Sequence, residues 1–117
     1  MTRINCIPPA ELVDKHLVAE YRELPRVFTL ARPCDDAPSQ YVLGTGHVKF
    51  FYNKLKWLTD RHGAIVQEMR KRGFAVNYPN APVNDNVQLY GDWTPTEDDA
   101  VLNRSRIAER LKTMKGL

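Results

Sequence analysis

Cysteine and histidine, the side chains that most often bind zinc, are scarce in this sequence. Its 117 residues include two cysteines, Cys6 and Cys34, and three histidines. Neither cysteine has a second cysteine or a histidine at the spacing that a structural zinc site requires. Nothing in the sequence calls for a disulfide, and in an intracellular protein we expect both thiols to be reduced.

Long apolar runs are also missing. No stretch approaches the roughly 20 apolar residues of a membrane-spanning helix, and the opening residues MTRINCIPP contain no apolar core of a secretion signal. We therefore expect an intracellular protein with no membrane partner. Apolar residues make up 43 % of the chain, which is enough for a core. A length of 117 residues suits one compact domain, residues 1–117, which we expect to be monomeric.

Three segments have the periodicity of amphipathic helices, and proline or glycine marks their ends. Internal repeats and low-complexity segments are absent. The Pro- and Asn-rich residues 74–93 predict an irregular, packed loop rather than a regular element. The sequence therefore predicts an all-α fold with three helices around one small core. The predicted helices cover residues 10–31, 47–72 and 94–115.

The third predicted helix opens with a capping signal, made by Thr94, Pro95 and Glu97. Its apolar residues are expected to face the core, whereas His62 in the second helix is expected on the surface. The inward residues predicted for the third helix are Val101, Ile107, Ala108, Leu111 and Met114.

The first predicted helix carries cations on one line. At about 100° per residue, Lys15, Arg22 and Arg26 nearly eclipse, and Glu23 lies beside them at the border of the apolar face. One interpretation is a solvated face with intrahelical ion pairs, such as Glu23 with Arg26. The other is a phosphodiester site, in which guanidinium groups hold phosphates while one carboxylate acts as a base. The cations form a strip around a single acid, and this favours the second interpretation.

The start of the chain offers a candidate nucleophile. Thr2 is small enough for the initiator methionine to be removed, which would leave a threonine α-amine. An α-amine has a pKa of about 7.7–8.0, against about 10.4 for lysine, so much of it is the free base near neutral pH. Such an amine can form an imine at a sugar C1′. The alternative is an idle terminus, since many proteins begin with Met-Thr.

Several strings closely resemble the phage pyrimidine-dimer DNA glycosylases, the endonuclease V family. They are MTRIN, HLVAEYRELPRVF, LGTGHVKFFYNKL, KRGF and GDWTPTEDD. The resemblance implies a compact helical protein whose N-terminal segment threads between the helices. It also implies a glycosylase with abasic-site lyase activity that acts on damaged double-stranded DNA without a metal or another cofactor. The expected location is the cytoplasm of a bacterium or of a phage-infected host.

The resemblance also implies roles for individual residues. The nucleophile corresponds to the α-amine of Thr2, and the catalytic carboxylate corresponds to Glu23. Together they would remove a base, at cyclobutane pyrimidine dimers in the first instance, and cut the strand by β-elimination. The DNA-contacting positions that the resemblance implies are Arg3, His16, Arg22, Arg26, Arg106 and Arg110.

Two alternatives remain open at this point. The resemblance thins in the third helix, and no aromatic residue follows Trp93. The lesion could therefore be another damaged or modified base. The chain could also be a DNA-binding module of the same fold without catalysis, for instance if Met1 is retained.

Overall fold

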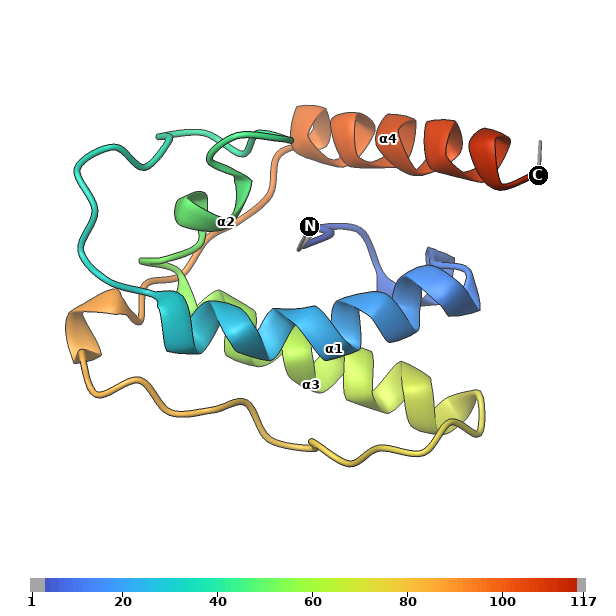
Figure 1. Ribbon diagram of the computed structural model, residues 1–117, viewed down its shortest axis with the longest axis horizontal. Helices are drawn as coiled ribbons and strands as arrows, with labels where there is room; N and C mark the ends of the chain where they lie inside the picture. Colours follow the sequence, from blue (N-terminus) through green and yellow to red (C-terminus); the bar gives the residue numbers. More distant parts are fainter. Residues whose placement is uncertain (1–3, 116–117) are drawn as a thin grey trace.

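The computed structural model describes residues 4–115, and its regular structure is helical (Figure 1). The helices are α1 (Asp14–Leu30), α2 (His47–Phe50), α3 (Leu55–Lys71) and α4 (Glu97–Lys115). Two 3₁₀ turns, η1 (Pro9–Glu11) and η2 (Val87–Leu89), complete the set. Within the described residues no strand forms, and Lys54 and Tyr90 make an isolated bridge. The predicted all-α class is confirmed.

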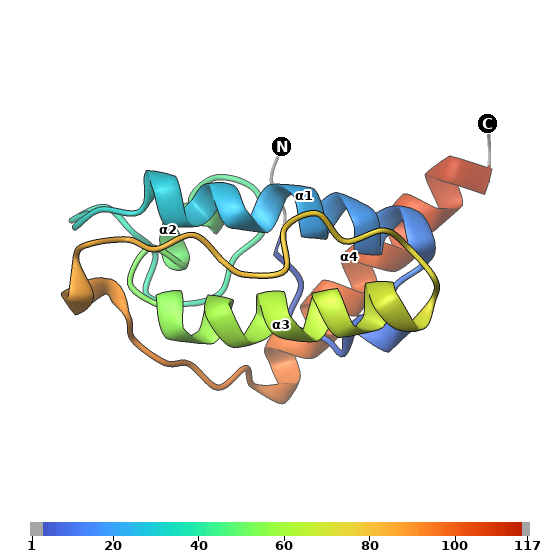
Figure 2. The same cartoon turned by 90° about the horizontal axis from the view of Figure 1, so that it is seen from below.

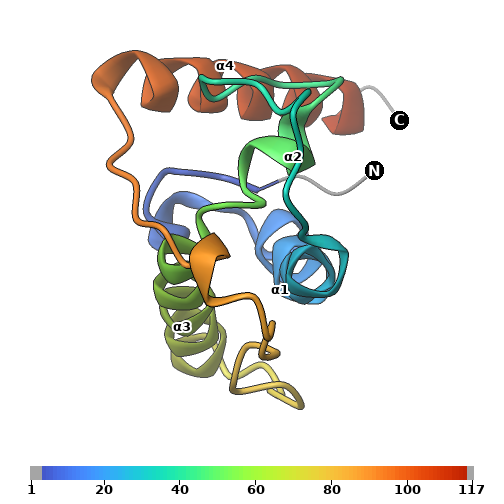
Figure 3. The same cartoon turned by 90° about the vertical axis from the view of Figure 1, so that its left-hand side faces the viewer.

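The helices enclose the segment at residues 4–7. α1 and α3 pack side by side and run antiparallel (Figure 2). The N-terminal segment, defined here as residues 4–7, passes between this pair and α4, which crosses on the opposite side (Figure 3). Ile4 and Ile7 are buried in the common core. The predicted threading of the chain between helices is therefore confirmed.

α1 begins later than predicted. Residues 9–11 form the 3₁₀ turn η1, and Leu12 is extended with φ −81° and ψ 139°. With this extended backbone Leu12 is only 2 % exposed and belongs to the core. α1 then runs through Pro25 to Leu30, although proline removes one backbone donor there. The apolar face of α1 is buried at Leu17, Tyr21, Leu24, Val27 and Phe28, whereas Val13, just before the helix, is 38 % exposed.

The predicted helix over residues 47–72 is wrong in its middle, because the chain breaks between α2 and α3. Lys54 leaves helical geometry with φ −125° and ψ 37°, and the Asn53 carbonyl accepts a hydrogen bond from Gly91 N–H at 3.1 Å. A Cβ at Gly91 would lie 2.5 Å from that carbonyl oxygen, so the approach requires glycine. The break also lets Phe50 and Phe51 both face inward, where they contact Trp93 edge-on.

α4 begins two or three residues after its predicted start, with a different cap. Asp99 N–H donates to Thr96 Oγ1 at 3.1 Å, and Thr96 N–H donates to Asp99 Oδ2 at 2.9 Å. This reciprocal pair is a capping box with aspartate in place of glutamate. The loop before it is packed as expected: Tyr21 Oη accepts the N–H groups of Asn77 and Tyr78.

The inward face of α4 also differs from the prediction. Val101 is 55 % exposed and Ala108 is exposed, whereas Asn103 is fully buried at 0 %. Ile107 and Leu111 are half-buried, and the side chain of Met114 lies outside the described residues. Among the described residues, no helix combines the length and apolar character that crossing a membrane requires.

Candidate active site

A cavity of about 640 Å³ opens between α1 and α4, and it brings several predicted site residues together. α1 supplies one wall, α4 the opposite wall, and the N-terminal segment and the loop before α2 supply the rest. The cavity therefore depends on residues from both ends of the chain. Its lining residues are Asn5, His16, Ala19, Glu20, Glu23, Leu43, Gly44, Arg106, Ile107 and Arg110.

Two carboxylates three residues apart on α1 reach this cavity, and their surroundings differ. Glu20 is 1 % exposed, and both of its oxygens accept hydrogen bonds from the Arg61 guanidinium, at 2.8 and 2.9 Å. Asn5 Nδ2 donates a third bond to Glu20 at 2.7 Å. A carboxylate that is buried and satisfied in this way has a structural role.

Glu23 has a more accessible carboxylate. Its side chain is 30 % exposed, and Glu23 Oε2 lies 3.1 Å from Arg26 Nη1 across one helical turn. Arg26 is 69 % exposed, so this ion pair is well solvated and weak. Of the two acids, Glu23 is therefore the one that is suited to exchange a proton with a molecule in the cavity.

The α1 wall of the cavity carries His16 beside the two carboxylates, and the α4 wall is basic. Burial, aided by the positive charges of Arg110 and Lys15, lowers the pKa of His16 below its ordinary value of 6.5. The imidazole is therefore neutral at pH 7, and it can exchange hydrogen bonds without adding charge. Arg106 and Arg110 approach from α4, and Arg106 Nη1 lies 3.4 Å from Glu109 Oε2. These guanidinium groups suit an anionic ligand.

The remaining predicted residues lie elsewhere. Arg22 and Arg26 are exposed on α1 and do not line the cavity. Both flank Glu23 in sequence, so they extend the basic surface beyond the cavity rim. Thr2 and Arg3 lie outside the described residues. Within residues 4–115, no three His, Cys, Asp or Glu side chains are placed to hold a metal ion.

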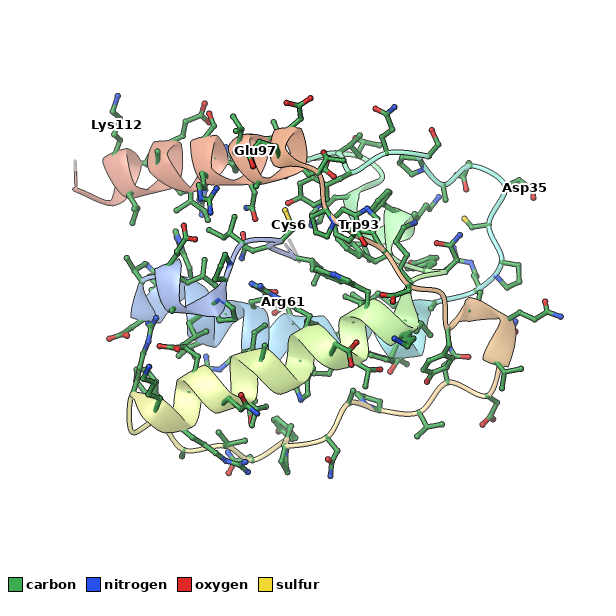
Figure 4. The ribbon with its side chains drawn as sticks, turned by 180° about the vertical axis from the view of Figure 1, so that it is seen from behind. Cys6, Asp35, Arg61, Trp93, Glu97 and Lys112 are labelled. Atoms are coloured by element: carbon green, nitrogen blue, oxygen red, sulfur yellow. The ribbon has the colours of Figure 1, made fainter. Side chains whose placement is uncertain are left out.

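The N-terminal segment is held by side chains from every part of the fold. Ile4 N–H donates to His47 Nε2 at 2.7 Å, and Tyr41 Oη donates to the Ile4 carbonyl at 3.1 Å. Because His47 Nδ1 lies 2.7 Å from the Val42 carbonyl, the Nδ1–H tautomer satisfies both of these contacts. Arg61 donates to the Ile7 carbonyl, and it reaches from α3 toward this segment (Figure 4). The main chain next to the cavity is therefore fixed on several sides.

Removing the Arg61 guanidinium should destabilise the protein strongly. Arg61→Met leaves the Glu20 carboxylate buried without its main partner, so we expect the free energy of unfolding to fall by about 3–5 kcal/mol. Urea denaturation followed by circular dichroism measures the change. The matched control is Lys56→Met, which removes the solvated ion pair between Lys56 and Asp92 at 3.4 Å and should leave the midpoint nearly unchanged. Equal midpoint shifts for the two variants would contradict the assignment of Glu20 and Arg61 as a buried structural pair.

Sequence reasoning missed Asn5, Glu20 and Ile107 as lining residues. Glu20 could have been predicted, since it lies one turn before Glu23 and must share its side of α1. Asn5 could not have been predicted, because its position depends on the threading of the N-terminal segment. Ile107 was expected inward, and the structure places it at the cavity wall with Arg106 and Arg110.

A comparison with protein families identifies the family of this chain. A family model described as pyrimidine dimer DNA glycosylase matches residues 1–81, which is more than half of the chain. The match includes α1 with Glu20 and Glu23, the N-terminal segment, and α3 with Arg61. The chain belongs to the pyrimidine dimer DNA glycosylase family.

Proposed function

We propose that this protein is a DNA glycosylase and abasic-site lyase that acts at cyclobutane pyrimidine dimers as a monomer. The observation that carries the proposal is the single cavity that Glu23, Asn5, His16, Arg106 and Arg110 line together. It combines an accessible carboxylate, guanidinium groups from α4 and the N-terminal segment, through Asn5. The family supplies the substrate class, which is DNA containing a damaged pyrimidine.

The proposed nucleophile is the α-amine of Thr2 after removal of Met1. Ile4 is buried and anchored to His47, and Asn5 lines the cavity that contains Glu23. Two residues of extended chain span at most about 7 Å. An amine on residue 2 is therefore tethered within that distance of Ile4 N, and this short tether supports its role near Glu23.

The chemistry has two stages. In the first, the neutral amine attacks C1′ of the damaged nucleotide, and the glycosidic bond breaks as the N–C1′ bond forms. The base leaves with the bonding electrons and takes up a proton, and opening of the sugar ring gives a protonated imine. The Glu23 carboxylate stabilises the positive charge that develops on the sugar.

In the second stage, Glu23 removes a proton from C2′. The electrons of that C–H bond form a C2′=C3′ double bond, and the 3′ phosphate leaves with the C3′–O electrons. Water then hydrolyses the imine and releases the amine. The DNA strand is cut, and the enzyme returns to its starting state.

The cations have separate roles in this proposal. Arg106 and Arg110 hold phosphates beside the cavity, and neutral His16 donates or accepts a hydrogen bond there. Arg22 and Arg26, exposed on α1, hold phosphates outside it, and Arg3 would act next to the amine. Phosphates then compete for Arg26, whose contact with Glu23 is solvated and weak.

Nicking of supercoiled DNA tests this function. Ultraviolet-irradiated DNA and depurinated DNA should both be nicked in buffer containing a chelator, whereas untreated DNA should stay closed. Irradiated DNA that photolyase has first repaired is the matched control, and it should resist nicking if cyclobutane dimers are the lesion. Persistent nicking after photolyase treatment would point to another damaged base, and binding without nicking would point to a non-catalytic module.

A further inference from the structure

Asn103 is a fully buried polar residue in the middle of α4, on the side that faces the N-terminal segment. Its amide oxygen accepts the Cys6 N–H at 2.7 Å, and its amide nitrogen donates to Asn5 Oδ1 at 2.8 Å. Both ends of the side chain therefore bind the segment that passes beneath the helix. A buried amide with both ends satisfied specifies one arrangement of its partners.

The contacts of Asn103 continue through the protein interior. Asn5, which Asn103 orients, donates to Glu20, and Glu20 pairs with Arg61. Arg61 in turn donates to the Ile7 carbonyl. This polar network, comprising Asn103, Asn5, Glu20 and Arg61, starts on α4, crosses to α1 and α3, and returns to the N-terminal segment. Asn103 is the residue that connects α4 to this polar network.

Apolar contacts do not by themselves fix where α4 sits. Val101 and Leu102 are 55 % and 41 % exposed, and Ile107 is half-buried. Among the described side chains of α4, Arg104 makes a further polar link at the surface, where it donates two bonds to the Glu11 carboxylate at 2.9 and 2.8 Å. These two bonds join α4 to Glu11 of η1 rather than to residues 4–7. The Arg104 contact therefore docks α4, whereas the Asn103 contacts orient residues 4–7.

We infer that Asn103 is a positioning residue for the reaction: from α4 it holds the N-terminal segment so that the terminal amine meets the substrate beside Glu23. This inference rests on the proposed function. The amine belongs to residue 2, so it inherits any displacement of Ile4, Asn5 and Cys6. A displacement of about 1 Å at a reacting group can cost about 10²-fold in rate. α4 also lies outside the residues that match the family model.

The variants are Asn103→Leu, which keeps the approximate volume but removes both hydrogen bonds, and Asn103→Ser, which keeps a small hydroxyl. Arg104→Ala is the matched control on the neighbouring position of α4. Mass spectrometry first verifies that each protein starts at Thr2, and circular dichroism measures its folded fraction. If Asn103→Leu does not fold, Asn103→Ser carries the test.

The first readout is the single-turnover rate of imine formation on a duplex with an abasic site, measured by borohydride reduction at saturating enzyme. The second is the Kd for a duplex with a tetrahydrofuran site, which cannot form an imine. We expect the rate per folded molecule to fall about 10²-fold in Asn103→Leu and at least about tenfold in Asn103→Ser. The Kd should change less than about threefold, and Arg104→Ala should keep the wild-type rate within the same factor.

Three results would overturn the inference. Asn103 variants that form the imine at the wild-type rate would show that the residue serves stability only. A rate loss in Arg104→Ala equal to that in Asn103→Leu would assign the effect to docking of α4 as a whole. Wild-type protein that gives no adduct would overturn the proposed function, and this inference with it, whereas the first two results leave the proposed function standing.

Discussion

Replacing Glu23 with glutamine should lower the rate of strand cleavage at an abasic site by about 10²–10⁴-fold and leave the fold intact. Glutamine has nearly the same shape but cannot take the C2′ proton or stabilise a cationic sugar. The fold should tolerate the change because the side chain is 30 % exposed and its ion pair with Arg26 is solvated. Single-turnover cleavage of an abasic duplex measures the first effect, and thermal unfolding measures the second.

Glu109→Gln is the matched control for this prediction. Glu109 also pairs with an arginine three residues away, at 3.4 Å, but it lies on α4 and does not line the cavity. We expect its cleavage rate to stay close to that of the wild type. If Glu23→Gln cleaves as fast as Glu109→Gln, Glu23 has no part in proton transfer and the cavity requires another base.

The different roles that we propose for Glu20 and Glu23 come from their different neighbours. Arg61 balances the charge of Glu20, and Asn5 donates a hydrogen bond to it. Through these contacts Glu20 helps to hold the N-terminal segment. Glu23 is one turn further along and faces the same cavity with a weaker partner. The two residues are chemically identical, so differences in burial and hydrogen bonding are what assign a structural role to Glu20 and, in our proposal, a reactive role to Glu23.

Helical periodicity predicted the class and the approximate places of α1 and α3, because each of these two helices buries an apolar stripe. It failed where contacts distant in sequence override local preference. Residues 51–54 leave the helix because Asn53 and Lys54 bond to residues near Gly91, and no local signal records this. His62 was expected on the surface, yet it is 1 % exposed and stacks on Tyr21 beneath the loop that carries Tyr78.

The site was predictable only where side chains lie on one helix face or follow the family pattern. His16 and Glu23 are seven residues apart, which places them on one line of α1, and both line the cavity. The apolar pattern did not predict which side of α4 faces the site, because that side is largely polar. It carries Asn103, Arg106 and Arg110 at three- and four-residue spacing. A hydrophobic stripe identifies a face that packs on a core, whereas this face packs on a buried backbone segment.

Moving the terminal amine should abolish covalent capture of DNA. Insertion of one serine before Thr2 leaves an α-amine but shifts it by up to about 3.5 Å, so we expect imine formation to fall by more than about 10²-fold. Acetylation of the terminus removes the free electron pair and should eliminate the adduct. Borohydride reduction on abasic DNA, followed by mass spectrometry of the tryptic peptides, measures both the yield and the attached residue.

The same serine added after Leu117 is the matched control, and it should leave the rate unchanged. In the unmodified protein the rate should rise between about pH 7 and pH 8, because the nucleophile is the deprotonated amine and its ordinary pKa is about 7.7–8.0. A lysine nucleophile with an ordinary pKa would instead continue to gain rate toward pH 10. An adduct mapped to a lysine, or one that persists in the acetylated protein, would remove the amine of Thr2 from the mechanism. Glu23 would then have to act beside a different nucleophile, and the anchoring of residues 4–7 would be a matter of stability alone.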